Sequence, residues 1–200
     1  MRGRTPRLAL GLGLALGLAV AGGACAPASS FRPASAMSAG HTQEVGFGAT
    51  LVGPRPYVDE PTSTVGHAWL TQAYGEFVRV SFVSAFDADA FAGGVALALL
   101  PLSTQRAVAG VEVELGFAWA SFGLPMAART VGDTWVYATP RIATWGDRLT
   151  PGVPFGLDVH VAHAISARAE CALTWMDFEP NNRRVLYGLA LAYQFGENSK

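Results

Sequence analysis

Residues 184–195 read RVLYGLALAYQF, and two kinds of side chain alternate along this stretch. One set is bulky and apolar, and the other is mostly small. The first set is Val185, Tyr187, Leu189, Leu191, Tyr193 and Phe195, and the second is Leu186, Gly188, Ala190, Ala192 and Gln194. A period of two is that of a β-strand, because successive side chains of a strand point to opposite faces of the sheet. The stretch therefore predicts a strand with one bulky face and one narrow face.

The same alternation recurs along the chain from residue 44 to residue 196, and it predicts about eight strands. The expected strands lie within residues 45–52, 69–83, 93–102, 110–121, 134–145, 153–162, 165–175 and 184–195. Pro140 lies inside the fifth of them and predicts a local break in pairing, because proline cannot donate to the ladder. We expect residues 121–134, SFGLPMAARTVGDT, to form a long turn before that strand.

The composition limits the class of protein. The chain has 200 residues, which suits one sizeable domain, and only 14% of them are charged, with a formal net charge of -1. Since there is no basic excess to neutralise phosphates, nucleic acid is not expected as a partner. Two cysteines are too few for a disulfide framework.

The narrow faces of the strands are built from Gly, Ala and Ser with isolated charges, which is a poor surface for water but a good lining for a tube. The bulky faces then require an apolar surrounding, which lipid supplies. Strands that cross lipid must pair every backbone group, so the sheet must close on itself. The sequence therefore predicts an all-β fold, a closed antiparallel up-and-down transmembrane β-barrel of about eight strands. The alternative is a soluble, lipid-anchored periplasmic barrel whose bulky rows face inward and bind a small apolar ligand.

The N-terminus has the pattern of an export signal. Arg2, Arg4 and Arg7 precede the apolar run of residues 8–20, and AGGACAPASS follows. Cleavage before Cys25 would give a lipoprotein with an acylated Cys25, which we favour, and cleavage after Ala26 is the alternative. In that second case a Cys25–Cys171 bridge becomes an option. The expected organisation is a signal peptide at 1–24, a lipid-anchored flexible tether at 25–43, the barrel at 44–196 and a tail at 197–200.

The chain resembles the small eight-stranded outer-membrane barrels of Gram-negative bacteria over residues 44–196. The resemblance rests on the repeated alternation, the export signal, aromatic residues near strand ends such as Trp119, Trp175 and Tyr193, and the terminal YGLALAYQFG. It implies a place in the outer membrane, contact with outer-membrane lipid, and insertion by the barrel-assembly machinery. Any specific function would then lie in the loops, through an unidentified surface partner.

The alternation also predicts which charges point into the barrel. They are Arg79, Glu112, Glu114, Arg141, Asp158, His160, Arg168 and Glu170. Since an unpaired charge in a narrow barrel is costly, the mixture of signs predicts a mutually neutralising network. Eight strands enclose a space only wide enough for side chains, so this network would plug the lumen and exclude a general diffusion pore. A three-residue loop at 163–165 would set His160 opposite Arg168.

Catalysis is not expected. Some outer-membrane barrels of similar size hydrolyse acyl chains with Ser, His and an acid, and only His160, Ser166 and Glu170 share a face here. All three would point away from lipid, and no GxSxG elbow is present. His67 and Trp69 are expected in or beside a solvated loop. No metal-ligand spacing and no phosphate-binding glycine loop occurs, so we expect neither a metal nor another cofactor.

Overall fold

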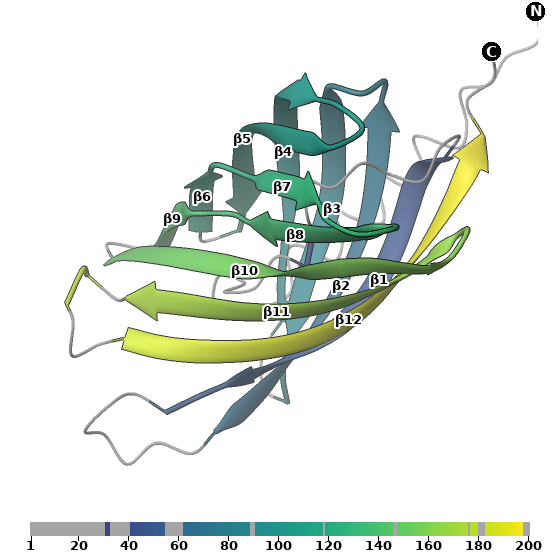
Figure 1. The fold of residues 1–200 in the computed structure, drawn as a ribbon. Coiled ribbons are helices and arrows are strands. Elements are labelled where there is room, and N and C mark those ends of the chain that lie inside the picture. Colours follow the sequence, from purple (N-terminus) through teal and green to yellow (C-terminus); the bar gives the residue numbers. More distant parts are fainter. Residues whose placement is uncertain are drawn as a thin grey trace, which may run out of the picture.

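The computed structural model describes residues 31–32, 41–54, 62–88, 91–117, 119–145, 148–175, 177–179 and 183–197. These residues form one antiparallel sheet that curls round and closes into a barrel (Figure 1). Its strands are β1 His41–Val52, β2 Ser63–Tyr74, β3 Val78–Phe86, β4 Phe91–Ser103, β5 Ala107–Gly116, β6 Trp119–Gly123, β7 Met126–Arg129, β8 Thr134–Ala138, β9 Arg141–Trp145, β10 Arg148–Ala162, β11 Ile165–Trp175 and β12 Arg183–Glu197. No described helix is long and apolar enough to cross a membrane.

The twelve strands occupy ten positions around the ring. β6 and β7 both pair with β5, and β8 and β9 both pair with β10, so each of these couples is one strand interrupted in its middle. β12 pairs with β1 and closes the ring. The prediction of a closed antiparallel barrel is confirmed, whereas the predicted number of eight strands is wrong.

Two of the ten strands were not predicted, because the alternation in their sequences is weak. Residues 69–83 contain the end of one strand and the start of the next, joined by a turn at which Gly75 adopts a φ of 67°. A positive φ is accessible to glycine without steric cost, which allows the chain to reverse there. Residues 121–134 are not a long turn, because β7 and the end of β6 occupy most of the segment and only residues 130–133 connect β7 to β8.

Two neighbouring strands are interrupted at the same level of the barrel. The first break separates β6 from β7 at Leu124 and Pro125, and the second separates β8 from β9 at Thr139 and Pro140, so the predicted break at Pro140 is confirmed. The breaks stay hydrogen-bonded to their neighbours, since the Leu124 amide donates to the Pro140 carbonyl at 2.9 Å and the Gly110 amide donates to the Pro125 carbonyl at 3.0 Å. The ring therefore remains closed where prolines cannot donate.

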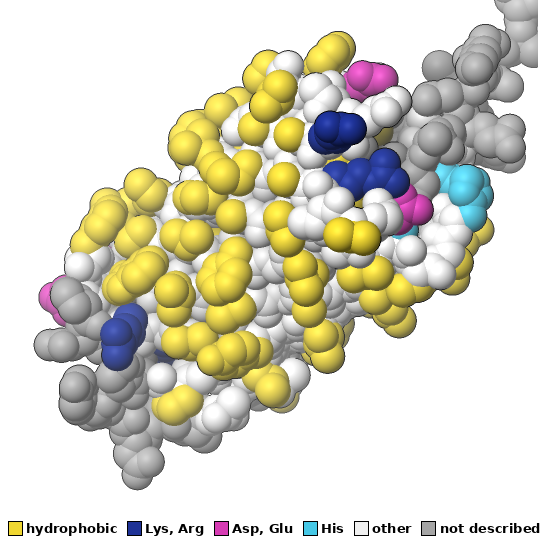
Figure 2. All heavy atoms as spheres, viewed as in Figure 1, with side chains coloured by type: hydrophobic (Ala, Val, Ile, Leu, Met, Phe, Trp, Pro, Cys, Tyr) yellow, Lys and Arg dark blue, Asp and Glu magenta, His cyan; other side chains and the backbone are white. Residues whose placement is uncertain are grey.

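The bulky faces of the strands point outward. In β12, Leu189 is 70% exposed, whereas the next residue, Ala190, is 7% exposed. Figure 2 shows apolar side chains spread over the outer face in view, with charged side chains gathered toward the two ends. The alternative with bulky rows around an internal apolar ligand is therefore wrong.

Trp119 is an exception to the predicted faces. The alternation within residues 110–121 puts Trp119 on the same face as the exposed Leu115, but Trp119 is buried, and its indole lies over Gly94 and Gly116. A Cβ atom at Gly116 would lie 1.9 Å from Nε1 of Trp119. The reversal between β5 and β6 resets the alternation, so the parity of β5 does not extend to Trp119.

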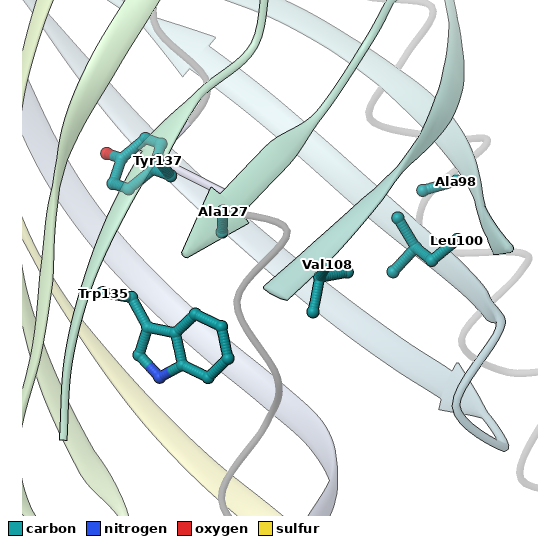
Figure 3. Close-up of a cluster of buried hydrophobic side chains, with 6 residues drawn as sticks. All are labelled: Ala98, Leu100, Val108, Ala127, Trp135 and Tyr137. Carbon is teal, nitrogen blue, oxygen red and sulfur yellow. The ribbon is translucent and has the colours of Figure 1, made fainter. Parts of the chain in front are cut away.

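The start of β1 and the end of β12 lie at the same end of the barrel, where His41 pairs with Glu197. The connections at this end are residues 75–77, 104–106, 130–133 and 163–164, whereas the longer connections 53–62 and 176–182 join strands at the opposite end. An apolar cluster lines the inner face beside the 104–106 and 130–133 turns (Figure 3). It consists of Ala98, Leu100, Val108, Ala127, Trp135 and Tyr137.

Candidate functional site

The structure places all eight predicted interior charges on the inner wall of the barrel. Arg79 and His160 are half-buried, and the other six are buried, with Glu114 and Asp158 fully so. The long strands β5, β10 and β11 position most of them, because alternate residues of one strand project into the same space. Six of them gather into two clusters, Asp158 and His160 around Arg168 and Glu112 and Arg141 around Glu114.

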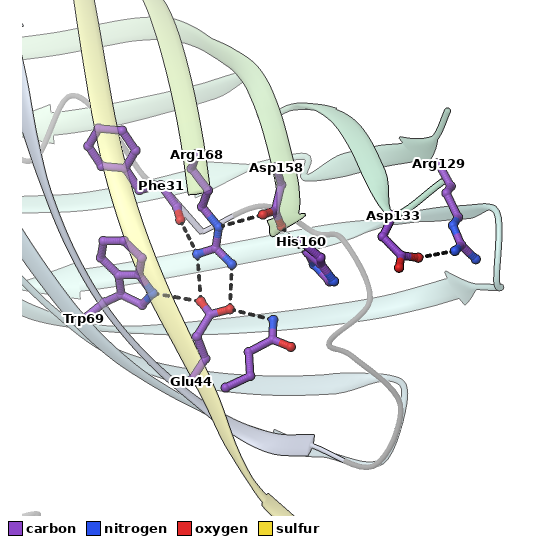
Figure 4. Close-up of polar contacts among 9 residues, drawn as sticks. Phe31, Glu44, Trp69, Arg129, Asp133, Asp158, His160 and Arg168 are labelled. Atoms are coloured by element: carbon purple, nitrogen blue, oxygen red, sulfur yellow. Dashed lines mark hydrogen bonds and ion pairs between the residues drawn. The ribbon is translucent and has the colours of Figure 1, made fainter. Parts of the chain in front are cut away.

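Arg168 on β11 lies at the centre of the first cluster (Figure 4). Its two terminal nitrogens donate to both oxygens of Glu44, at 2.8 and 2.5 Å, and its Nε lies 3.3 Å from Oδ1 of Asp158. His160 lies on the far side of Asp158, with 3.7 Å between Nε2 and Oδ2. A bidentate guanidinium–carboxylate pair fixes both partners in orientation, so this cluster links β10 and β11 with β1, which is separated from β11 only by β12.

Glu114 on β5 lies at the centre of the second cluster. Its Oε2 accepts a hydrogen bond from Nη2 of Arg32 at 2.9 Å and lies 3.9 Å from Nη1 of Arg141. The neighbouring acid on the same face, Glu112, lies 3.5 Å from Nη1 of Arg32. Ser121 on β6 reaches Glu114 at 3.5 Å. The cluster therefore depends on a cation from outside the strands.

Several residues of this interior did not follow from the alternation. Glu44 accepts hydrogen bonds from Trp69 Nε1 at 2.9 Å and from Gln194 Nε2 at 3.1 Å. The narrow face of β1 carries Gly46 and Thr50, and extending that face by one step toward the N-terminus would have found Glu44. Trp69 and His67 are buried at 4% and 5% exposure, so their assignment to a solvated loop is wrong. They lie on the inner face of β2, a strand whose period was not recognised.

Phe31 and Arg32 were the least expected members. Both belong to the stretch predicted as a flexible tether, yet Phe31 is fully buried and Arg32 is 9% exposed inside the barrel. Residues 41–43 were also predicted as tether, but they belong to the barrel, because β1 begins at His41. Nothing in the local sequence distinguishes FR from a solvated dipeptide, and only its partners on distant strands account for its position.

The predicted register between β10 and β11 is wrong by two residues. His160 lies opposite Ser166, and Asp158 lies opposite Arg168, which brings the acid directly to its cation. The turn contains only residues 163 and 164, and an irregularity between His160 and Ala162 restores the parity that such a turn would otherwise violate. A β-bulge adds one residue to one strand, so parity alone does not fix a hairpin register.

The proposed catalytic group is not assembled. His160 and Ser166 are cross-strand neighbours, but Glu170 lies four residues further along β11, about 13 Å away at strand spacing. Within the described part of the chain, no hydrogen bond reaches the hydroxyl of Ser166. Glu170 instead accepts hydrogen bonds from the Tyr137 hydroxyl at 3.0 Å and the Phe31 amide at 3.1 Å.

Two predictions concern residues outside the described ranges. Cys25, the expected lipid attachment site, and the signal peptide at 1–24 both lie there. Cys171 is a free thiol on the outer face of β11, half-buried between neighbouring side chains. Among the described residues, no group of three or more His, Cys, Asp and Glu side chains could hold a metal ion.

These features define a closed antiparallel β-barrel of ten strand positions, with an apolar outer wall and a buried network of charges. No family model and no curated protein matches the sequence. Among solved structures, the chain is similar to the outer membrane protease OmpT from Escherichia coli, with a TM-score of 0.49 and 10% identity over 83% of this chain and 100% of that one.

Two further similar structures cover a smaller share of this chain than OmpT does. The KdgM porin in complex with disordered oligogalacturonate has a TM-score of 0.46 and 10% identity, over 76% of this chain and 99% of that one. Neisserial surface protein A has a TM-score of 0.39 and 9% identity, over 76% of this chain and 97% of that one. At these identities the likeness concerns the fold alone.

Proposed function

We propose that the protein is an outer-membrane β-barrel with a structural or surface-interaction role, whose lumen is closed by its charged network. In this proposal it is neither a general porin nor an enzyme, and Cys25 carries a lipid that anchors the same chain. Outer-membrane lipid surrounds the strands, the barrel-assembly machinery inserts them, and a surface partner is recognised by the loops at the end opposite the termini.

The observation that carries the proposal is the contrast between the two walls. Residues such as Phe47, Leu115 and Leu191 are more than half exposed on the outer wall, where water would penalise a large apolar surface. The buried acids and arginines lie inside, where the network supplies their partners. This is the distribution expected of a barrel in lipid, since a water-soluble barrel would carry its charges outside.

Closure of the lumen follows from how the interior is filled. The Arg168 cluster projects inward from β1, β10 and β11, and the Glu114 cluster projects inward from β5 and β9 and includes Arg32. The apolar cluster around Trp135 and Tyr137 fills a further part of the interior (Figure 3). An open pore would need a continuous water path, and these buried side chains occupy the space for it.

The same interior favours a structural role over catalysis. Ser166 is 1% exposed, and Glu170, the acid that shares its face, is held by Tyr137 and Phe31. An acyl chain in the surrounding lipid would have to cross the strand wall to reach that hydroxyl. If the chain were an acyl hydrolase after all, Ser166→Ala would abolish release of fatty acid from phospholipid micelles.

The first experiment is gel mobility in SDS of protein extracted from the outer-membrane fraction, unboiled and boiled. We expect a shift on boiling, because a closed barrel in detergent resists unfolding until it is heated. Planar lipid bilayers with the same protein are expected to show no porin-like conductance. Absence of the shift, or recovery of the chain in the aqueous phase after cutting near Ala36, would contradict the proposal.

The lipid anchor is tested separately through Cys25. Labelling of growing cells with a palmitate analogue is expected to mark the full chain and not the Cys25→Ser variant. Cys171→Ser is the matched control, because it removes the other cysteine and leaves the proposed attachment site intact. Equal labelling of the Cys25→Ser variant and the natural chain would remove lipidation from the proposal.

A further inference from the structure

The dipeptide of residues 31 and 32 is held inside the barrel at its backbone. The Phe31 amide donates to Oε2 of Glu170 at 3.1 Å, and its carbonyl accepts from Nη1 of Arg168 at 2.8 Å (Figure 4). Both partners are buried charged groups, which make stronger hydrogen bonds than neutral ones. The backbone of a residue outside the strands is thus bound by two side chains of β11.

The ring of Phe31 occupies a slot that the barrel leaves open for it. It stacks on Trp69, with 6.2 Å between ring centroids, and meets the His67 ring edge-on at 5.3 Å. The floor of the slot consists of two glycines: a Cβ atom at Gly188 would lie 2.2 Å from Cζ of Phe31, and one at Gly48 would lie 3.2 Å from Cε2. The slot therefore exists because β1 and β12 carry no side chain at these positions.

The guanidinium of Arg32 meets an acidic pair. Glu112 and Glu114 project from the same face of β5 and lie 3.5 and 2.9 Å from its terminal nitrogens. The inner wall of the described chain carries five buried acids, three buried arginines that include Arg32, and the half-buried Arg79. Oε1 of Glu114 is buried and receives no hydrogen bond from any described residue. The two neighbouring acids and the buried Oε1 make this part of the lumen a site for a cation.

The walls of the site are held by contacts that do not involve the dipeptide. Glu44 fixes Arg168, the Tyr137 hydroxyl fixes Glu170, and Arg141 and Ser121 approach Glu114. Trp69 is oriented by its hydrogen bond to Glu44. Five strands, β1, β2, β5, β11 and β12, thus contribute to a preformed site, and the dipeptide occupies it as a ligand would.

We propose that the barrel contains an internal binding site for an aromatic–arginine segment, filled in cis by Phe31 and Arg32. When the dipeptide leaves, the site accepts another ligand of the same chemistry, namely a guanidinium adjacent to an aromatic ring. This site lies in the interior and does not depend on what the loops of the protein recognise.

The test uses the full-length chain with Phe31→Ala and Arg32→Ala, purified in detergent, and the probe acetyl-Phe-Arg-amide. Calorimetric titration is expected to show one saturable site in the double variant and at least tenfold weaker binding to the natural chain, whose site is occupied. The matched probe acetyl-Phe-citrulline-amide keeps the shape and loses the charge, and it is expected to bind at least tenfold more weakly than the arginine probe.

Two added substitutions locate the binding. Gly188→Ala in the double variant fills the ring slot without changing any charge, and Glu114→Gln removes one charge without filling the slot. Each is expected to weaken probe binding at least tenfold, whereas Arg129→Ala, at an exposed turn, is expected to leave it unchanged. Equal binding by the double variant and the natural chain, or no binding by a double variant that still shifts on boiling, overturns the proposal.

If the double variant does not fold into the form whose gel mobility shifts on boiling, the yield of folding is measured instead. Refolding into detergent micelles with the arginine probe present is then expected to raise the yield of the shifted form at least severalfold. The citrulline probe is expected not to do so. Equal yields with the two probes would overturn the proposal in this arm as well.

Discussion

The outer and inner walls of this barrel are built from the same strands, one residue apart. In β12, Leu189 and Leu191 face outward at 70% and 61% exposure, and the intervening Ala190 faces inward at 7%. The outer wall is uniform and apolar, so one large side chain there can replace another. The inner wall is made of small residues and a few charges, each with a particular partner. The effect of a substitution on stability is therefore expected to depend on whether it lies on the outer or the inner wall.

The largest expected effect comes from removing the cation at the centre of the inner wall. Arg168→Ala leaves Glu44 and Asp158 buried without their main partner. Breaking a buried pair on one side costs about 3–5 kcal/mol, so we expect loss of the heat-shifting form or a much lower urea midpoint in detergent. Arg148→Ala, which removes a partly exposed pair with Asp177, is the control and should change the midpoint little.

The second largest effect is expected from placing a charge on the apolar outer wall. Leu189→Arg places a charge among apolar residues that would face lipid, which costs about 2–4 kcal/mol near the middle of a bilayer. We expect reduced folding into phospholipid vesicles, measured as the fraction of protein that shifts on boiling. Val131→Arg lies in a turn where the natural side chain is 84% exposed, and it should fold normally. Equal folding of the two variants would show that β12 does not face lipid.

A smaller effect is expected from a change on the inner wall that keeps an aromatic ring and removes one hydrogen bond. Trp69→Phe removes the indole N–H that donates to Glu44 at 2.9 Å. Hydrogen bonds to charged groups contribute about 1.5–3 kcal/mol, and the lower figure applies here because Arg168 and Gln194 still hold Glu44. Tyr187→Phe on the outer wall is the control, and unfolding in urea should separate the two variants. An unchanged midpoint for Trp69→Phe would show that the hydrogen bond contributes nothing.

The smallest effect is expected where neither wall is involved. Arg129 and Asp133 pair across the turn between β7 and β8, where both side chains are exposed. Exposed pairs contribute about 0–1 kcal/mol, so Arg129→Ala should leave the unfolding midpoint almost unchanged. A loss as large as that of Arg168→Ala would show that burial does not explain the difference between the clusters.

How much of this could be predicted differs from strand to strand. The faces of β10, β11 and β12 follow from sequence, because their outer residues are bulky and their inner residues are small or charged. β2 could not be recognised in the same way, since Trp69 and His67 on its inner face are as large as its outer residues. β7 was missed because Pro125 interrupts the alternation just before it. A large side chain on the inner wall, or a break in a strand, removes the local signal on which prediction depends.

The candidate site, like the strands, could be predicted only in part. The alternation placed Glu112, Glu114, Asp158 and Arg168 on the inner wall, but it did not show which of them meet. The partner of Asp158 depended on the turn at residues 163–164, and the partner of Glu114 came from Arg32, 82 residues earlier in the chain. Contacts between residues so far apart in sequence depend on how the ring closes. The local period of two does not specify that closure.

The sequence by itself determined that the chain forms strands with two unlike faces and that charges belong on the narrower one, because side-chain direction in a strand is a local property of the backbone. Only the tertiary structure decided that ten strand positions close the ring, which inward-facing charges meet, and that Phe31 and Arg32 occupy the interior. Closure fixes the registers, the registers set the positions of the inward-facing acids, and Glu112 and Glu114 on β5 hold Arg32 inside.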